Sequence, residues 1–423
     1  MGARFMNKEI QQKNIIFYSV FLVITIVVFN FFFRTENYVN FDIIPKTLQK
    51  ITISQNIAPQ RLFINTWRII KNSYVDETLN NQDWTRWRIR YIKHIKTIED
   101  ADIAINTMLA SLNDPYNKFL QSTLFSKQKM IIDSEITGIG ILFNKSGNEI
   151  VINHIMDNSP AQSANILPGD TIVSVNGEKT DKLEMKTIIN TIENSHNKEI
   201  EITIKRNNIL ITKKVKRRSI PIKTMEYEIT KDNIGIITLA NIMGWKAVSD
   251  FKDIIIKTNN TKGIIIDLRN NYGGVLANAI QMANFMMDKG KIVSIQSRIN
   301  TKYQIYSDGE KIFKNKPIVI LINKNTASAS EILAGTLKAN LNAILIGESS
   351  YGKNSIQQVI PMQNETGLIL TTDRYILPDG NDIYGKGLTP DIIIQQDTIF
   401  TEKNDQQLRK AKKIIRELVK NKK

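Results

Sequence analysis

The sequence has no cysteine and only three histidines among its 423 residues. Without cysteine there can be no disulfide bond, no thiol nucleophile and no metal site built from thiolates. An oxidising compartment is therefore allowed but not required. The histidines, His94, His154 and His196, all lie in the first half of the chain, and none belongs to a His-Glu-x-x-His zinc motif. No metal or organic cofactor is indicated.

Acidic residues are also scarce, since 41 Asp and Glu face 57 Lys and Arg, a formal charge of +16. Such an excess can attract nucleic acid or an anionic membrane. Here the lysines are spread along a chain that is rich in Ile, Asn and Lys throughout. The one dense cluster, KKVKRR at residues 213–218, is typical of a solvated strand edge. We expect no nucleic-acid partner.

One long hydrophobic run stands out, IIFYSVFLVITIVVFNFFF at residues 15–33. Its 19 residues make roughly 28 Å of helix, close to the thickness of a bilayer core. Arg4, Lys8 and Lys13 precede it, so residues 1–14 are expected in the cytoplasm and the rest outside. No small-x-small cleavage site follows, which favours a retained signal anchor. We expect a single-pass protein of a bacterial inner membrane that faces the periplasm.

The remaining chain divides into five segments by pattern. Trp67, Ile70 and Tyr74 recur at helical spacing, which predicts a helical region. The strands of a layered α/β segment are expected at residues 234–239, 263–268, 318–322 and 344–346, with helices at 275–287 and 330–341. The expected segments are a linker (34–60), a helical region (61–132), a β module (133–218), an α/β segment (225–397) and a basic amphipathic surface helix (398–423).

The β module has short β-type runs at residues 139–143, 149–154, 171–175 and 200–205, separated by Gly, Asn and Pro. Its "TGIGILF" (137–143) and "SPAQSANILPGDTIVSVNGEKT" (159–180) resemble a PDZ domain. Gly-Ile-Gly alone is also compatible with an ordinary strand bend. The resemblance implies that a peptide's terminal carboxylate binds the backbone N–H groups of a Gly-x-Gly loop and that the peptide adds as a strand. The loop residues are Gly138, Ile139, Gly140 and Ile141.

Two serines stand close together in "NKNTASASEILAG" (323–335), between a buried strand and a helix. Ser328 and Glu331 match the capping box Ser-x-x-Glu, and that stretch alone favours a capping role. A nucleophilic serine needs a base. The α/β segment has no histidine, so the base would be a lysine. Lys353 follows 25 residues later in the glycine-containing "GESSYGKNSIQQ" (347–358), far enough for one helix and one strand to bring it back.

Four motifs of the α/β segment resemble the carboxyl-terminal-processing, or tail-specific, proteases of peptidase family S41. They are "DLRNNYGG" (267–274), "TASASEILAG" (326–335), "GESSYGKNSIQ" (347–357) and "GKGLTPDI" (385–392). The turn "DPYNKFL" (114–120) and the PDZ-like module match in order, so the resemblance covers most of the chain beyond residue 60. It implies a multidomain α+β protein: an α/β protease core of the layered crotonase and Clp-protease kind, an inserted PDZ domain, an N-terminal helical region and a single transmembrane helix.

The resemblance also implies a Ser-Lys dyad. Ser328 would be the nucleophile, Lys353 the general base and Gln357 the residue that orients the lysine. A lysine with its ordinary pKa of about 10.4 is almost always charged at pH 7, so the base must be partly buried. An uncharged glutamine can hold the amine without restoring its proton.

The negative oxygen of a tetrahedral intermediate requires preorganised N–H donors. Ala329 at the positive end of the following helix is one candidate, and Gly273 or Gly274 is another. These glycines are also compatible with a simple tight turn. Tyr272 stands where the family commonly has Pro, and Asn354 where it commonly has Gly.

We therefore expect a serine endopeptidase that cuts exported proteins near their C-termini, with the PDZ domain docking the substrate tail. The partners are protein substrates and the inner membrane, and the resemblance allows an adaptor protein and a homo-oligomer. One alternative is a noncatalytic membrane-tethered PDZ scaffold. Another is a crotonase-type fold that handles acyl-thioesters.

Overall fold

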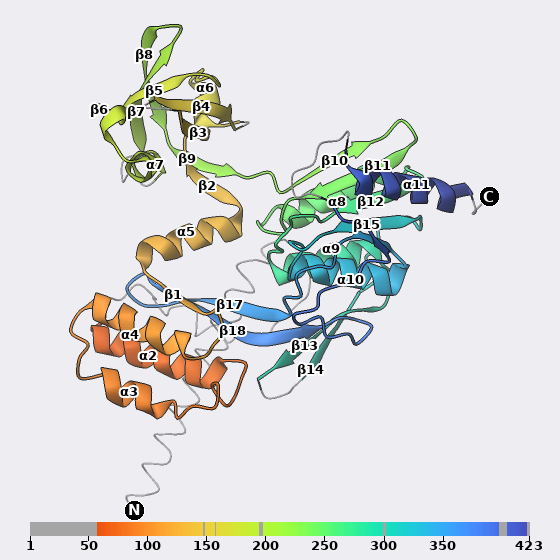
Figure 1. Ribbon diagram of the computed structural model, residues 1–423, viewed down its shortest axis with the longest axis horizontal. Helices are drawn as coiled ribbons and strands as arrows, with labels where there is room; N and C mark the ends of the chain where they lie inside the picture. The colour runs from red at the N-terminus through yellow and green to blue at the C-terminus, as the bar shows by residue number, and fades with distance from the viewer. Residues whose placement is uncertain are drawn as a thin grey trace, which may run out of the picture. The chain divides into compact units, whose positions relative to one another are not determined.

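The computed structural model describes residues 57–146, 149–156, 158–193, 198–298, 302–396 and 404–420 (Figure 1). These residues form two compact units. Unit 1 contains the described residues up to Phe125 together with Ile295–Tyr303 and Ser355–Tyr375, and unit 2 contains the rest. The division cuts across the expected 225–397 segment, because strands from its middle pair within unit 1. The apolar run at residues 15–33 lies outside the described residues, and no described helix is long and apolar enough to cross a membrane.

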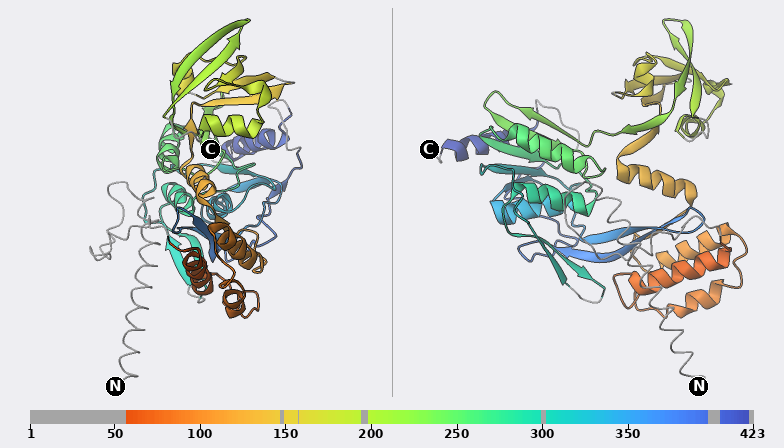
Figure 2. Two further views of the ribbon diagram at one scale, coloured as in Figure 1. Left: turned by 90° about the vertical axis from the view of Figure 1, so that its left-hand side faces the viewer. Right: turned by 180° about the vertical axis from the view of Figure 1, so that it is seen from behind.

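Unit 1 is built on a cluster of helices. They are α2 (Pro59–Ser73), α3 (Thr85–Tyr91) and α4 (Ile98–Ala110), and α5 (Ser122–Asp133) begins in this unit. The expected helix face is confirmed, since Trp67, Ile70 and Tyr74 are buried. The Trp67 indole N–H donates to the Trp84 carbonyl (2.8 Å), and the Trp84 indole donates back to the Trp67 carbonyl (3.1 Å). α2 and α4 lie side by side in both views of Figure 2.

A five-stranded sheet that the sequence analysis did not predict contains the remaining strands of unit 1, and parts of β13, β14 and β18 are counted in unit 2. Its order is β1-β18-β13-β14, with β17 beside β18. Asn117, in the Asp-Pro turn, accepts a hydrogen bond from the Thr371 N–H (2.8 Å) and so brings β1 to β18. The strands are β1 (Lys118–Leu120), β13 (Lys291–Ser297), β14 (Lys302–Tyr306), β17 (Ser355–Pro361) and β18 (Gly367–Ile376).

The β module of unit 2 is a six-stranded sheet ordered β3-β4-β5-β7-β8, with β6 beside β5. All four expected strands are present, and a core of isoleucines fills the module. The basic cluster lies on the edge strand β8 and the residues after it, as expected of a solvated strand edge. The elements are β2 (Glu135–Gly138), β3 (Ile141–Ser146), β4 (Glu149–Ile155), α6 (Pro160–Ser163), β5 (Thr171–Val175), β6 (Glu178–Lys179), η2 (Thr180–Lys182), α7 (Met185–Glu193), β7 (Glu199–Arg206), β8 (Ile209–Lys216) and β9 (Arg218–Pro221), which pairs with β2.

The α/β part of unit 2 has a sheet ordered β10-β11-β12-β15-β16-β19, parallel apart from β10. The four expected strands are confirmed. β12 and β15 are buried at every position, as in parallel sheets covered on both faces. The strands are β10 (Met225–Ile229), β11 (Ile234–Leu239), β12 (Gly263–Asp267), β15 (Ile318–Ile322), β16 (Ile344–Gly347) and β19 (Ile392–Ile393), and the helices are α8 (Ala247–Thr258), α9 (Leu276–Met286) and α10 (Ala329–Leu341).

The C-terminal helix α11 (Gln406–Lys420) belongs to the core. The sequence predicted an amphipathic helix on the surface, and the helix is present. Its apolar stripe, Ala411, Ile414 and Ile415, packs on the sheet against Ile265 and Leu321. It is therefore one of the layers that cover the sheet, not a tail.

A buried ion-pair network joins this helix to the end of β12. The Arg269 guanidinium donates to Asp267 (Nη2–Oδ2, 2.5 Å) and to Asp405 (Nη2–Oδ2, 2.8 Å), just before α11. A third partner is the Gln407 side-chain oxygen at 3.2 Å. The side chains of Arg269 and Asp405 are each only 3% exposed. The network therefore ties the loop after β12 to the C-terminal segment.

Replacing Asp405 with Asn should lower the free energy of unfolding by about 3 kcal/mol at pH 7, because a buried arginine loses one of its two charged partners. Burial alone would raise the pKa of Asp405, but hydrogen bonds from Arg269 and Leu408 hold it below its ordinary value. A lowered carboxyl pKa stabilises the fold at neutral pH, and this stabilisation is lost as the pH falls below about 4. The difference between variant and wild type should therefore narrow in acid.

Urea denaturation from pH 7 down to pH 3 measures this difference. The control is Asp288→Asn, because Asp288 pairs with Lys311 while 71% of its side chain is exposed. That change should cost less than about 1 kcal/mol. A difference for Asp405→Asn that stays constant down to pH 3 would contradict the ion-pair account.

Candidate active site

Ser328 occupies a sharp turn between β15 and α10. Its backbone angles are φ 57° and ψ −120°, a region that residues with a side chain rarely adopt. An ordinary N-cap residue is extended, so the capping motif alone did not predict this geometry. Strain of this kind, on the order of 1–3 kcal/mol, persists only where the surroundings enforce it. Here the Ser328 carbonyl accepts from the Glu331 and Ile332 N–H groups at 2.8 and 3.0 Å.

The turn before Ser328 is anchored to the loop after β12. The Thr326 hydroxyl donates to the Leu268 carbonyl (2.8 Å) and accepts from the Asn323 N–H (3.0 Å). One residue on, the Ala327 N–H donates to the Asn271 carbonyl (3.0 Å). The motifs "DLRNNYGG" and "TASASEILAG" are therefore neighbours at the carboxyl edge of the sheet.

Glu331 joins the turn of Ser328 to the turn of Lys353. Its carboxylate oxygen Oε2 accepts from the Ser328 N–H (2.7 Å) and from the Lys353 N–H (3.0 Å). The two amide nitrogens therefore lie no further apart than the sum of these distances. The other oxygen, Oε1, accepts from the Ser350 hydroxyl (2.5 Å) and the Gly352 N–H (2.7 Å).

The Glu331 side chain is fully buried. Burial raises its pKa above the ordinary value, and the four hydrogen bonds to the carboxylate oppose that rise. A buried carboxylate is costly unless donors surround it, so each donor also keeps the others in place. Capping and positioning are thus two effects of one side chain.

Gly352, in the turn before Lys353, makes room for the motif "GKGLTPDI". Its φ is +84°, and a methyl group on its Cα would lie 2.6 Å from the Ile383 carbonyl oxygen. Gly387 in turn packs on Ser350, and the Gly385 N–H donates to the Gly352 carbonyl (3.0 Å). This motif therefore acts as a support for the lysine turn. Asn354, the departure from the family pattern, is tied to the same support through Asp382 (2.9 Å).

The candidate oxyanion donors lie around Ser328. Gly273 touches it so closely that a methyl group there would be 3.0 Å from the Ser328 Cβ. The Gly273 N–H, however, already donates to the Asn271 side-chain oxygen (2.9 Å), which disfavours it as a donor to substrate. Gly274 lies opposite Ile242 in an isolated β-bridge. The two bonds of this bridge are made by the Gly273 carbonyl and the Val275 N–H, so the N–H of Gly274 itself points away from Ile242. Within the described residues, the N–H groups of Gly274 and Ala329 donate to no acceptor.

The other predicted residues are placed as follows. Gln357 belongs to β17 of unit 1, where its side-chain amide donates to the Thr371 hydroxyl (3.1 Å). Ser330, the second serine of "NKNTASASEILAG", is fully buried in the first turn of α10. Ser328 and Lys353 are partly accessible.

The predicted peptide-binding loop of the β module lies between β2 and β3. Ile139 is fully buried, and its carbonyl accepts from the Ala161 N–H (2.8 Å). Gly140 has φ +78° and packs on Ser159, where a methyl group would be only 2.4 Å from Cβ. Asn165 has φ 57°, in the left-handed region that asparagine tolerates better than most residues with a side chain.

The comparisons with known proteins agree with both resemblances. The model of Peptidase family S41 matches residues 233–394, and that of the PDZ domain matches residues 137–216. The chain is 33% identical over 349 residues to carboxyl-terminal-processing peptidase 2 of Arabidopsis thaliana chloroplasts, covering 78% of this chain and 68% of that protein. It is 31% identical over 354 residues to the carboxyl-terminal-processing protease of Picosynechococcus, covering 80% and 84%.

The chain belongs to the carboxyl-terminal-processing peptidases. It is a serine-type peptidase, a hydrolase, and the prediction of a PDZ domain is confirmed. Among solved structures it is similar to the photosystem II D1 C-terminal processing protease, with a TM-score of 0.55 and 26% identity, over 85% of this chain and 98% of that one.

Two residues that hold together the loops around the site, Glu331 and Asp405, were not predicted from the sequence of this peptidase. Glu331 was read only as half of a capping box, although its spacing from Ser328 was a usable signal. Asp405 carried no signal, because its partner Arg269 is 136 residues away.

Replacing Glu331 with Gln should lower kcat about 100-fold and leave KM unchanged, since the side chain positions two turns and does not touch substrate. An amide has one acceptor oxygen, and its NH2 group would face two of the four donors. Initial rates on an unfolded protein substrate, together with a thermal melt, measure this. Glu228→Gln on the exposed strand β10 is the control. A variant that loses stability but keeps kcat would limit Glu331 to helix capping.

Proposed function

We propose that this peptidase uses a dyad of Ser328 and Lys353 to cleave exported proteins near their C-termini. The observation that carries the proposal is the Glu331 carboxylate, one oxygen of which accepts from the backbone amides of both residues. This contact brings together two turns that lie 25 residues apart in the chain. Neither cysteine nor a histidine of the α/β segment is available as an alternative nucleophile or base.

In the proposed mechanism the Lys353 amine takes the proton of the Ser328 hydroxyl as the oxygen attacks the peptide carbonyl. The tetrahedral intermediate collapses when the lysine passes this proton to the leaving amine. Water then attacks the acyl-enzyme, with the lysine again acting as base. Gln357 as the group that orients the lysine remains a prediction from the family resemblance.

The oxyanion would bind to the N–H groups of Ala329 and Gly274. Ala329 begins a helix of 13 residues, so its amide lies at the positive end of a helix dipole. Both amides lack an acceptor among the described residues, and Gly273 brings its loop against Ser328. Loss of one such donor typically costs about 100- to 1000-fold in kcat.

The PDZ domain would dock the substrate's C-terminal carboxylate. In the described part of the chain, the N–H groups of Ile139 and Gly140 donate to no acceptor, as a carboxylate-binding loop requires. Gly140, whose positive φ and close packing on Ser159 leave no room for a side chain, holds this loop in one conformation. The peptide would then extend the sheet along β3.

Replacing Ser328 with Ala or Lys353 with Ala should abolish cleavage, at least 1000-fold, and leave peptide binding unchanged. A fluorescent substrate with an unfolded tail, read by gel and by anisotropy, separates the two effects. Substrates with amidated C-termini should be cut at least tenfold more slowly than those with free C-termini, because the PDZ loop then loses its anionic ligand. Equal rates for both would remove the docking role.

The same experiment separates the peptidase from a PDZ scaffold. If wild-type protein cuts no unfolded tail but binds peptides, the chain acts as a scaffold. Thiol reagents and chelators should leave the rate unchanged, since the dyad contains neither a thiol nor a metal.

We also propose that residues 15–33 anchor the protein in the inner membrane with its active site in the periplasm. The support is the apolar length and the basic flank at residues 1–14. Full-length protein should sediment with membranes, and protease added to spheroplasts should degrade it. A chain lacking residues 1–34 should be soluble with unchanged kcat. Membrane retention of this truncated chain would refute the anchor.

A further inference from the structure

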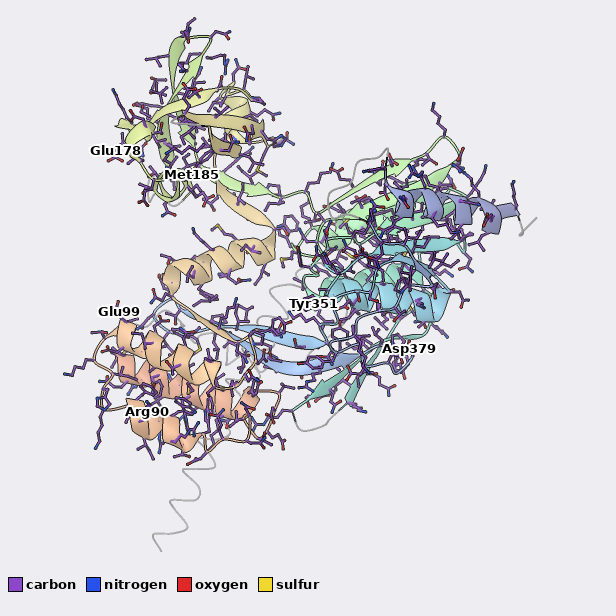
Figure 3. All side chains as sticks on the ribbon, viewed as in Figure 1. Arg90, Glu99, Glu178, Met185, Tyr351 and Asp379 are labelled. Atoms are coloured by element: carbon purple, nitrogen blue, oxygen red, sulfur yellow. The ribbon has the colours of Figure 1, made fainter. Side chains whose placement is uncertain are left out.

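Three exposed tyrosines lie on the loop of Lys353 and on two loops bonded to the turns of Ser328 and Lys353. Tyr272, Tyr351 and Tyr384 are 69%, 54% and 61% exposed. A single exposed aromatic residue is normal on a protein surface. Figure 3 marks Tyr351 on the loop that follows β16.

Backbone hydrogen bonds place these loops side by side. The loop of Tyr272 contacts the serine turn through the Ala327 N–H and the Asn271 carbonyl (3.0 Å). The Tyr351 N–H donates to the Thr326 carbonyl (2.9 Å) on the same turn.

The loop of Tyr384 continues the series. The Gly385 N–H donates to the Gly352 carbonyl (3.0 Å), directly after Tyr351. Each tyrosine is therefore at most one residue away from a backbone hydrogen bond that joins its loop to a neighbouring loop. We call the three side chains the tyrosine rim.

The backbone beneath the rim cannot shift freely. Tyr272 precedes Gly273, which has φ +95° and would collide with the Ala327 carbonyl (2.6 Å) if it carried a methyl group. Tyr351 precedes Gly352, which is held in the same way against the Ile383 carbonyl. The rings are thus presented from fixed positions, which reduces the entropy lost when they bind a ligand.

A polypeptide whose carbonyl reaches the Ser328 hydroxyl must run over the neighbouring loops. Its flanking side chains would then meet the tyrosine rim, whose rings favour apolar and aromatic groups. Lys324 on the serine turn and Lys386 on the loop of Tyr384 are exposed and would repel a basic side chain. Tyr272, one member of the rim, stands where the family commonly has Pro.

We infer that the tyrosine rim binds an aromatic or large apolar side chain of the substrate within a few residues of the cleaved bond, and so determines where an unfolded tail is cut. The inference rests on the proposed function, because it assumes that Ser328 attacks the peptide bond.

The test uses synthetic peptides that share one C-terminal tail and carry a single Phe, Ala or Lys at each of the positions flanking the cleaved bond. Wild-type protein should show the highest kcat/KM for Phe and the lowest for Lys at one or two positions. Tyr272→Ala and Tyr351→Ala should each lower kcat/KM for the preferred Phe peptide by about tenfold, and that for its Ala counterpart less than twofold. Tyr272→Phe should keep the preference.

Tyr303→Ala is the matched control, because Tyr303 on β14 is 57% exposed and lies away from these loops in the sequence. This variant should change kcat/KM neither for the Phe peptide nor for its Ala counterpart. Equal losses on Phe and Ala peptides in the Tyr272 and Tyr351 variants, or no loss at all, would overturn the inference.

Binding of the same peptides to the Ser328→Ala variant keeps the two proposals apart. If wild-type protein cuts no peptide, the proposed function fails, yet a Phe peptide should still bind several-fold more tightly than its Ala counterpart through the rim. Equal dissociation constants for both peptides would overturn the rim even if cleavage is observed.

Discussion

The Glu331 carboxylate is the interaction on which the site depends. Its two oxygens accept from four donors in two separate turns, including the amides of Ser328 and Lys353. A charge taken out of water costs several kcal/mol unless its partners are in place, so the carboxylate and its donors form one cooperative unit. The turn of Ser328 cannot adopt its strained conformation without also positioning the turn of Lys353. Because Glu331 lies in the first turn of α10, the helix dipole and this network act at the same point.

The parallel sheet explains why the motifs meet at all. "DLRNNYGG", "TASASEILAG" and "GESSYGKNSIQ" follow β12, β15 and β16, which are adjacent parallel strands. The carboxyl ends of such strands share one edge, where ligand sites of α/β sheets commonly form. The fourth motif, "GKGLTPDI", adds no reacting group in the proposed mechanism and instead packs on Gly352. Behind this edge the buried pair of Arg269 and Asp405 connects the glycine loop to α11.

Local patterns predicted the core well because its strands are continuous apolar runs bounded by polar turns. β11 and β15 have the expected bounds, and β12 differs by one residue. The sheet of β1, β13, β14, β17 and β18 was missed, since the pairing of Lys118 with Ile369 joins residues about 250 positions apart. α11 was predicted as a helix from its periodicity, but the surface on which its apolar stripe packs has no signature in its own sequence. The same limit hid Asp405.

The sequence by itself determined the chemical class of this protein, because four motifs placed the chain in a family of serine-type peptidases. The absence of cysteine, and of histidine in the α/β segment, directed the prediction of a base to lysine. The sequence also determined the order of segments, because periodicity and turn residues act over a few positions. Only the tertiary structure decided which backbone amides are available, that Gly273 already uses its own on Asn271, and that one carboxylate serves both Ser328 and Lys353. These properties depend on distances between segments remote in the chain, which packing of the whole sheet establishes.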